Sequence, residues 1–193
     1  MTSTAALRKS ERTKLAILDA ARAHFATRGF DATSIRAVAA DASIDPAMVM
    51  RYFGSKHELF AAAVDVDLAL PDLTKVLKTR RGRALTAHFI RRWEGDLSDD
   101  VLVILLRSAV TSDRAAERLR SVFADQLVEM LRPLVEASQL HRRAGLISSQ
   151  MLGLALTRYL VPLPAVTRQS PDQLIEDLSP TIQRYLHGPL TSS

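Results

Sequence analysis

Apolar residues recur along most of the chain at steps of three and four, which is the spacing of one face of an α-helix. The first such stripe consists of Leu15, Leu18, Ala21 and Phe25. Arg28 and then Gly29 follow it, and glycine is common just after the last turn of a helix because it tolerates positive φ. The pattern therefore predicts a first helix from about Ser10 to Arg28. Because no convincing run of strands appears, the expected fold class is all-α.

Two short helices joined by a tight turn are predicted next. Thr33 or Ser34 can cap the first of them, which ends near Ala42. Asp45 is a favoured N-cap residue for the second, and Pro46 suits the first position inside a helix. The spacing therefore predicts helix, turn and helix within about twenty residues.

A fourth helix is predicted directly after these two. The preceding helix ends around Phe53, and Ser55 with Glu58 forms the pattern of a capping box, in which each side chain satisfies an exposed amide. The apolar pattern continues towards Leu70, and Pro71 stops it.

Longer helices are predicted beyond Pro71. They are placed at Asp72–Thr79, Arg83–Glu94, Asp99–Thr111, Arg114–Ala137, His141–Leu160 and Asp172–His187. Pro133 is expected to kink the fourth of these helices or to end it early. Residues 95–98, 111–113 and 162–171 are interpreted as connections.

Composition limits the chemistry that the chain can perform. Hydrophobic residues make up 47% and charged residues 24% of the 193 residues, as in an ordinary globular protein. The sequence holds no cysteine, which excludes a disulfide framework, thiol catalysis and cysteine-ligated zinc or iron–sulfur sites. The five histidines are scattered without metal-ligand spacing, and no glycine-rich phosphate loop appears. No metal, cofactor or enzymatic activity is therefore expected.

The charge is unevenly distributed. The formal net charge is +5, and residues 1–60 hold nine Lys or Arg against six Asp or Glu, so this third carries three of the five excess charges. A basic segment suits a polyanionic partner, although a solvated basic tail would look the same. No secretory signal or membrane-spanning stretch is recognised, so a cytoplasmic protein without membrane contact is expected.

The segment from Thr33 to Lys56 carries the geometry of a helix-turn-helix. The second helix of such a pair enters the major groove of DNA with its N-terminal residues towards the base edges. Hydroxyls, free amides and cations around it can contact phosphates. Any helical bundle can also contain two short helices joined by a turn, so spacing alone leaves both interpretations open.

Residues 12–60, RTKLAILDAARAHFATRGFDATSIRAVAADASIDPAMVMRYFGSKHELF, resemble the N-terminal domain of the TetR (tetracycline-repressor-like) family of regulators. The matching positions are Ile17-Leu18-Asp19-Ala20-Ala21 with Phe25, Gly29, Thr33-Ser34, Arg51-Tyr52-Phe53, and Lys56 with Leu59. Two positions depart from the family pattern. Ser43 stands where the turn commonly has glycine, and Met50 stands where the family commonly has a tyrosine that contacts phosphate.

The resemblance implies a DNA-binding surface at the helix-turn-helix. Its expected residues are Arg12, Lys14, Thr33, Ser34, Arg36, Asp45, Pro46, Ala47, Met48, Arg51, Tyr52 and Lys56. The hydroxyl and basic side chains are expected mainly at phosphates, whereas Ala47, Met48 and Tyr52 are expected at base edges or thymine methyl groups. Asp45 is expected to act mostly as a cap.

The resemblance also implies an omega-shaped homodimer whose last two long helices form a four-helix bundle with those of the partner. The expected interface residues are Leu152, Ala155, Leu156, Tyr159, Leu178, Ile182 and Tyr185. Intramolecular core is the alternative for each of them. The middle helices would enclose a pocket for an unknown small-molecule effector. Its candidate residues are His88, Phe89, Trp93, Leu106, Arg107, Phe123, Leu127, Met130, Met151 and Arg158.

Together these expectations describe a sequence-specific transcription regulator, a repressor that binds a near-palindromic operator as a dimer and is released by a small molecule. Residues 1–55 would form the DNA-binding domain with its basic tail, residues 56–70 a connecting helix, and residues 71–193 the effector and dimerisation domain. Two alternatives stay open: a helical interaction protein that no longer reads DNA, and a small helical enzyme with an unrecognised site in residues 72–193.

Overall fold

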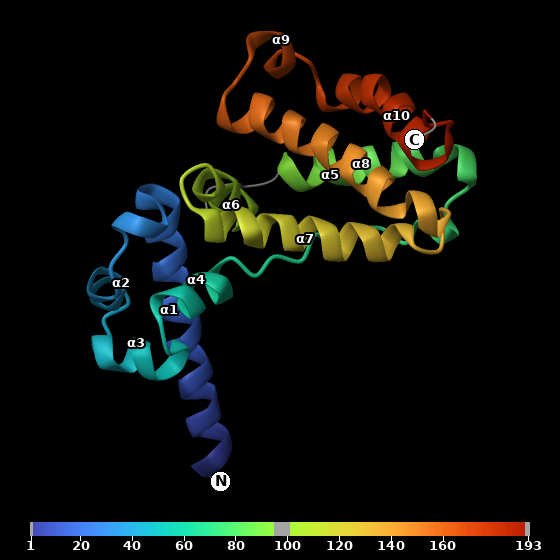
Figure 1. Ribbon diagram of the computed structural model, residues 1–193. Coiled ribbons are helices and arrows are strands. Elements are labelled where there is room, and N and C mark those ends of the chain that lie inside the picture. Colours follow the sequence, from blue (N-terminus) through green and yellow to red (C-terminus); the bar gives the residue numbers. More distant parts are fainter. Residues whose placement is uncertain (1, 95–100, 192–193) are drawn as a thin grey trace. The chain divides into compact units, whose positions relative to one another are not determined.

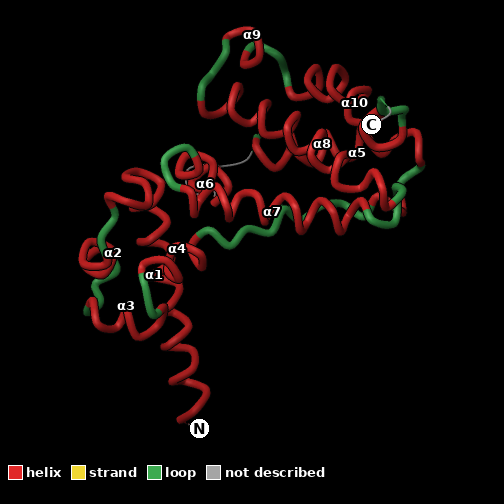
Figure 2. The backbone as a smooth tube through the Cα atoms, viewed as in Figure 1, coloured by secondary structure: helices red, strands yellow, loops and turns green. Residues whose placement is uncertain are grey.

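The computed structural model describes residues 2–94 and 101–191, with side chains from Lys9 onward (Figure 1). Within these ranges every regular element is a helix and there is no strand (Figure 2). The all-α fold class is therefore confirmed. Contacts divide the chain into two compact units, one within Met1–Val66 and Ser98–Leu119, the other within Asp67–Leu97 and Arg120–Ser193. Each unit is thus built from two separate stretches of sequence.

The first unit is organised around its long first helix. Its elements are α1 (Thr2–Ala32), α2 (Ile35–Asp41), α3 (Pro46–Phe53), α4 (Lys56–Ala63), α6 (Val101–Ala109) and the first turns of α7 (Asp113–Leu131). Helices α2, α4 and α6 all pack against α1 (Figure 1). Helix α6 corresponds to the predicted helix Asp99–Thr111, whose predicted start at Asp99 lies outside the described residues.

Three aromatic rings join α1 to α4. The Phe60 ring meets the edges of Phe25 and Phe30 at centroid distances of 4.9 and 5.1 Å, and all three side chains are buried. Gly29 interrupts α1 between the two phenylalanines with φ 72°, so the predicted stop after Arg28 is present as a break. A further helical turn then runs to Ala32, which periodicity did not predict.

The predicted helix 56–70 is wrong in its second half, because α4 ends at Ala63. The Ala63 carbonyl accepts a hydrogen bond from Arg22 Nε at 3.1 Å instead of from the amide of a further helical turn. Beyond it the backbone follows other partners: the Leu68 amide donates to Gln126 Oε1 at 2.8 Å. Ala69 has φ 48°, outside the helical region.

The predicted helix Asp72–Thr79 is also wrong. Two 3₁₀ turns, Leu73–Lys75 and Lys78–Arg80, replace it. The Arg81 Nε group lies within hydrogen-bonding distance of the carbonyls of Leu73 (2.8 Å) and Val76 (3.2 Å), which a continuous helix would use internally. Leu73 is buried in the core of the second unit, so the chain is held to that core at this point.

The second unit contains the remaining helices. They are α5 (Arg81–Trp93), the rest of α7, a 3₁₀ turn (Ala137–Gln139), α8 (Leu140–Ala155), α9 (Pro164–Thr167) and α10 (Pro171–His187). Helix α7 ends at Leu131, so the early end predicted from Pro133 is confirmed. The predicted helix 141–160 continues past Ala155 only as a π-helical turn, Leu156–Leu160. The short helix α9 lies within residues 162–171, for which the sequence predicts only a connection.

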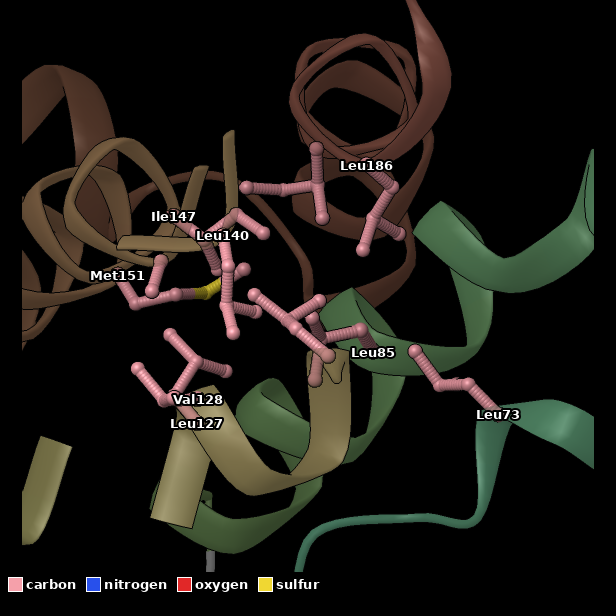
Figure 3. Close-up of a cluster of buried hydrophobic side chains, with 11 residues drawn as sticks. Leu73, Leu85, Leu127, Val128, Leu140, Ile147, Met151 and Leu186 are labelled. Carbon is pink, nitrogen blue, oxygen red and sulfur yellow. The ribbon is translucent and has the colours of Figure 1, made fainter. Parts of the chain in front are cut away.

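One apolar cluster joins α5, α7, α8 and α10 (Figure 3). Its buried members are Leu73, Leu85, Leu127, Val128, Leu131, Leu140, Ala144, Ile147, Met151, Ile182 and Leu186. These residues come from segments far apart in the sequence, so tertiary packing rather than local propensity stabilises this unit.

Candidate DNA-binding site

Helix α3 presents its N-terminal end to solvent. The Asp45 carboxylate caps it by accepting the Ala47 amide at 2.7 Å, and Pro46 occupies the first turn. Asp45, Pro46 and Ala47 are all exposed, whereas Val49 and Phe53 on the opposite face are buried. The helix is therefore anchored by its apolar face, and its front is free to meet a partner.

The turn between α2 and α3 is tight and carries strain. The Ile44 amide donates to the Ala39 carbonyl at 2.9 Å, which closes the turn. Ser43 has φ 55°, a left-handed conformation that side chains rarely adopt. The turn therefore forms with Ser43 in place of the family's common glycine. Ser43 adopts a positive φ there, which glycine tolerates better because it has no Cβ atom.

The predicted basic residues surround α3 without all being free. The side chains of Arg12, Lys14, Arg36 and Arg51 are exposed. The Lys14 Nζ atom lies 5.8 Å from the Phe53 ring centroid. Lys56 is half-buried, donates to the Asp31 carbonyl at 3.1 Å and lies 4.5 Å from the centroid of Phe30. Lys56 therefore joins α4 to the end of α1 as well as adding charge.

The two hydroxyl residues before α2 differ in their surroundings. Thr33 is 2% exposed and donates to the Gly29 carbonyl at 2.7 Å, so its side chain closes the kink in α1. The expectation that Thr33 contacts phosphate is therefore corrected, because its hydroxyl is buried. Ser34 is exposed and caps α2 by accepting the Ala37 amide at 3.2 Å.

Tyr52 is tied to a residue that the sequence analysis missed. Its hydroxyl lies 3.1 Å from Ser10 Oγ, which joins the last turns of α3 to the N-terminal part of α1. Met48 and Tyr52 are half-buried, and Ala47 is exposed on the front of the helix. Met50 is 43% exposed, so its thioether faces solvent at the position where the family commonly has a tyrosine. No local pattern could have linked Ser10 to a residue 42 positions away.

A second hydrogen bond fixes α2 on α1. His24 is buried, and its Nε2 atom lies 2.6 Å from a carboxylate oxygen of Asp41 at the end of α2. Together with the Arg22 bond to Ala63, it holds α2 and α4 at set positions along α1. The helix-turn-helix is thereby a rigid part of the first unit.

The candidate effector residues are divided between the units. Leu106 and Arg107 lie on α6 in the first unit; the other eight lie in the second. Leu127 and Met151 belong to the buried cluster, which Phe89 and Met130 also contact. The structure thus brings these four members of the set together at one cluster.

Two polar members of that set, His88 and Arg158, already have partners. His88 Nε2 lies 3.0 Å from the Leu68 carbonyl. Arg158 forms an ion pair with Glu94 (2.8 Å) and donates to two carbonyls of the segment 166–169, so it is a paired charge. Trp93 is buried and stacks on Tyr159 at 5.0 Å, while its indole nitrogen has no acceptor in the described part of the chain. Burial and the hydrogen bond to Glu94 raise the pKa of Tyr159.

Two of the expected interface residues are corrected. Ala155 and Ile182 have no exposed surface in the single chain, so they are core residues and have no area left to bury against a partner. Leu156 is exposed, and Leu152, Tyr159, Leu178 and Tyr185 are half-buried. The exposed residues of α8 are His141 and Arg142 in its first turn, followed by the small residues Gly145, Ser149 and Gly153.

Family models match both parts of the chain. Residues 17–63 match the bacterial regulatory proteins of the tetR family, and residues 80–186 match the tetracyclin repressor-like C-terminal domain. The chain belongs to the TetR family. This membership confirms the resemblance, and members of the family are DNA-binding transcription factors and not enzymes. The helical enzyme alternative is thereby closed.

Individual relatives are similar over different lengths. An HTH-type transcriptional repressor of Mycobacterium tuberculosis is 46% identical over 55 residues, which is 28% of this chain and 29% of that protein. A TetR-family regulator from Streptomyces coelicolor is 27% identical with a TM-score of 0.69, covering 91% of this chain and 95% of its own. AibR, solved with isovaleryl coenzyme A and operator DNA, shares the fold at 20% identity and a TM-score of 0.56 over 92% of this chain and 100% of its own.

Residues 2–94 and 101–191 contain no helix that could span a membrane. None of the helices there combines the length and the apolarity that crossing a bilayer requires.

Proposed function

We propose that this TetR-family regulator is a repressor that binds a near-palindromic operator as a homodimer and is released by a small molecule. The observation that carries the proposal is the exposed, capped front of α3, Asp45 to Ala47, on a helix whose other face is buried. Such a helix can enter the major groove without any change in the core of its domain. A regulator of this kind acts where bacterial DNA is, so we place it in the cytoplasm at the nucleoid.

In this proposal the contacts divide into two classes. Ala47 and Met48 lie at the front of α3 and meet base edges or thymine methyl groups, with the ring of Tyr52 one turn behind them. The phosphate contacts come from Arg12, Lys14, Ser34, Arg36, Arg51 and Lys56. Thr33 is reassigned to positioning, because its hydroxyl is buried and donates to Gly29. Asp45 and Pro46 shape the end of the helix.

The exposed face of α8 supports the dimer. A Cβ atom added at Gly145 or Gly153 would meet no other atom within 4 Å in the protomer, so this face is open for another helix to approach closely. Leu156 lies on the same face, three residues after Gly153. Two copies paired through α8 and α10 would present two α3 helices to adjacent major grooves, about 34–36 Å apart.

The second unit is proposed to bind the effector. AibR has the same fold and was solved with both a coenzyme A thioester and operator DNA, which supports the same arrangement of functions here. Phe89 and Met130 border the buried cluster, and the indole N–H of Trp93 has no acceptor among the residues that the structure describes. The effector lowers operator affinity only through unequal affinity for two arrangements of the dimer. In this division residues 1–55 bind DNA, residues 56–70 connect the two domains, and residues 71–193 bind the effector and form the dimer.

A gel-shift experiment tests the proposal. DNA immediately upstream of the protein's own coding sequence is the first probe, because regulators of this kind often control themselves or neighbouring genes. Ala47→Glu places a carboxylate at the front of α3, where it would face the bases and phosphates, and should abolish binding. Ala124→Glu makes the same change at an exposed position of α7 and should bind as the wild type does. Undiminished binding by Ala47→Glu would rule out α3 as the recognition helix.

A further inference from the structure

A pocket of about 310 Å³ lies in the second unit, where the segment between α7 and α8 meets the last turn of α10. One part of its lining is apolar and consists of Pro133, Leu134, Val135 and Leu186. The other part is polar and includes Glu136, Arg143 and His187. The pocket thus offers both apolar and polar groups to a ligand, and its volume is at the lower end of the range for small-molecule sites.

Arg143 is a buried cation without an acidic partner. It is 7% exposed, and its guanidinium donates to Gln139 Oε1 and to the carbonyls of Tyr185 and Gly188 at 2.6–3.0 Å. These acceptors are neutral, and no carboxylate in the described part of the chain forms an ion pair with it. These bonds use four of the five N–H groups, and the second one on Nη1 has no acceptor within residues 2–94 and 101–191. A buried charge in this state is costly unless an anion compensates it.

Further cations gather at the same place. Arg81 Nη1 lies 3.4 Å from His187 Nε2, and Lys78 is near enough to act on the same imidazole. Burial, and then the charges of Arg81, Lys78 and Arg143, lower the pKa of His187. The C-terminus of α10 accounts for part of this attraction, because its carbonyls favour positive charge. It does not account for the gathering of Arg143, Arg81 and Lys78 near a pocket, where none of the three forms an ion pair with a carboxylate of the described residues.

We propose that this pocket binds a small organic acid. The carboxylate would be held by the Nη1 group of Arg143 beside His187, and the apolar body would lie against Leu134, Val135 and Leu186. The volume corresponds to about ten water molecules, and thus to a ligand of about ten non-hydrogen atoms. The inference goes beyond the proposed operator binding and does not depend on it.

Calorimetric titration of the full-length protein with three probes at constant ionic strength tests the chemistry. Benzoate carries both the apolar body and the charge, benzamide is its neutral counterpart, and inorganic phosphate carries charge without the body. Benzoate should bind at least about tenfold more tightly than either of the others, because charge-assisted hydrogen bonds are the stronger kind. Equal binding of benzamide, or no binding of benzoate, overturns the proposal. Equal binding of phosphate reduces the site to an adventitious ion only.

Substitutions test the location. Arg143→Met should weaken benzoate binding at least about tenfold. Because this change also removes bonds to α10, Glu136→Gln provides an independent test at an exposed side chain. It removes the one carboxylate that lines the pocket and should strengthen binding about twofold to fivefold. The matched change Asp125→Asn, at an exposed residue of α7 that does not line the pocket, should leave affinity unchanged. Unchanged or weakened binding in Glu136→Gln contradicts the assignment.

The His187 imidazole gives a direct readout of occupancy. Its charged neighbours are Lys78 before α5, Arg81 on α5 and Arg143 on α8, with Glu136 across the same pocket. A bound carboxylate favours the protonated ring, so benzoate should raise the pKa of His187 measured by NMR. If benzoate binds and this pKa does not change, the ligand lies elsewhere and the proposal fails.

Discussion

The backbone of Gly82 touches the backbone of Gln183. The Gly82 amide donates to Gln183 Oε1 at 2.7 Å, and a Cβ atom added to Gly82 would lie 2.6 Å from the Gln183 nitrogen. The Gln183 side chain also donates to the Lys78 carbonyl at 2.9 Å. The start of α5 and the middle of α10 are therefore held together at a point where only glycine fits.

Replacing Gly82 by alanine should destabilise the protein by about 1–3 kcal/mol, because the backbones of α5 and α10 must separate to admit the methyl group. Urea unfolding measures the loss. A Gly82→Ala variant as stable as the wild type would show that the close contact does not exist.

Ser43→Gly should stabilise the protein by about 0.5–1 kcal/mol. Ser43 has φ 55°, and glycine adopts this conformation without the Cβ clash, which outweighs its larger entropy when unfolded. The reference is Ala124→Gly in the middle of α7, which should cost about 1 kcal/mol in unfolding experiments. If Ser43→Gly and Ala124→Gly lowered the free energy of unfolding equally, Ser43 would not have a positive φ.

The bond between Ser10 and Tyr52 should matter for DNA binding through the position of α3. Ser10→Ala and Tyr52→Phe should each weaken operator binding by a similar small factor without changing the preferred sequence. The double variant should be no weaker than either single one, because both changes remove the same bond. Fully additive losses in a gel-shift titration would mean that the two hydroxyls act separately.

Salt dependence should distinguish phosphate contacts from base contacts. Arg36→Ala should weaken all DNA sequences about equally and reduce the slope of log affinity against log salt by about 1. Arg168→Ala removes an exposed arginine from the second unit and should change neither. Met48→Ala should alter the preference among operators and leave the slope unchanged. Operator binding that is independent of salt concentration would contradict the proposed phosphate contacts.

The stability of the protein should fall in mild acid partly because of His187. Its pKa is lowered in the folded protein by burial and then by Arg81, Lys78 and Arg143, so the unfolded chain takes up the proton first. The contribution of this group is present above the unfolded pKa of about 6.5 and is lost as the pH falls below it. His187→Gln should therefore lose less stability between pH 7.5 and pH 5 than the wild type, as measured by urea unfolding. An equal or larger loss would contradict the lowered pKa.

The helix-turn-helix could be predicted from the sequence because its signals are local. Asp45 and Ser55 cap the helices that follow them, Gly29 breaks α1, and α7 ends early, two residues before Pro133, as expected. The end of α4 could not be predicted in this way. The apolar pattern continues past Ala63, but side chains from α1 and α7 take the backbone groups that a longer helix would have used.

The roles of single residues needed the tertiary structure. Thr33 and Ser34 are adjacent hydroxyl residues with the same prediction, and only the kink at Gly29 buries one and leaves the other exposed. Ile182 fits a stripe that either a partner or the core could cover, and its complete burial in the single chain decides for the core.

The sequence by itself determined the all-helical fold, the order of its first four helices and the family, because caps, breaks and apolar spacing act within a few residues. The tertiary structure alone decided that Ser10 meets Tyr52, that Gly82 lies against Gln183, and that the buried Arg143, which pairs with no carboxylate of the described residues, lines a pocket. These pairings join residues tens of positions apart, and their geometry follows from how the helices pack.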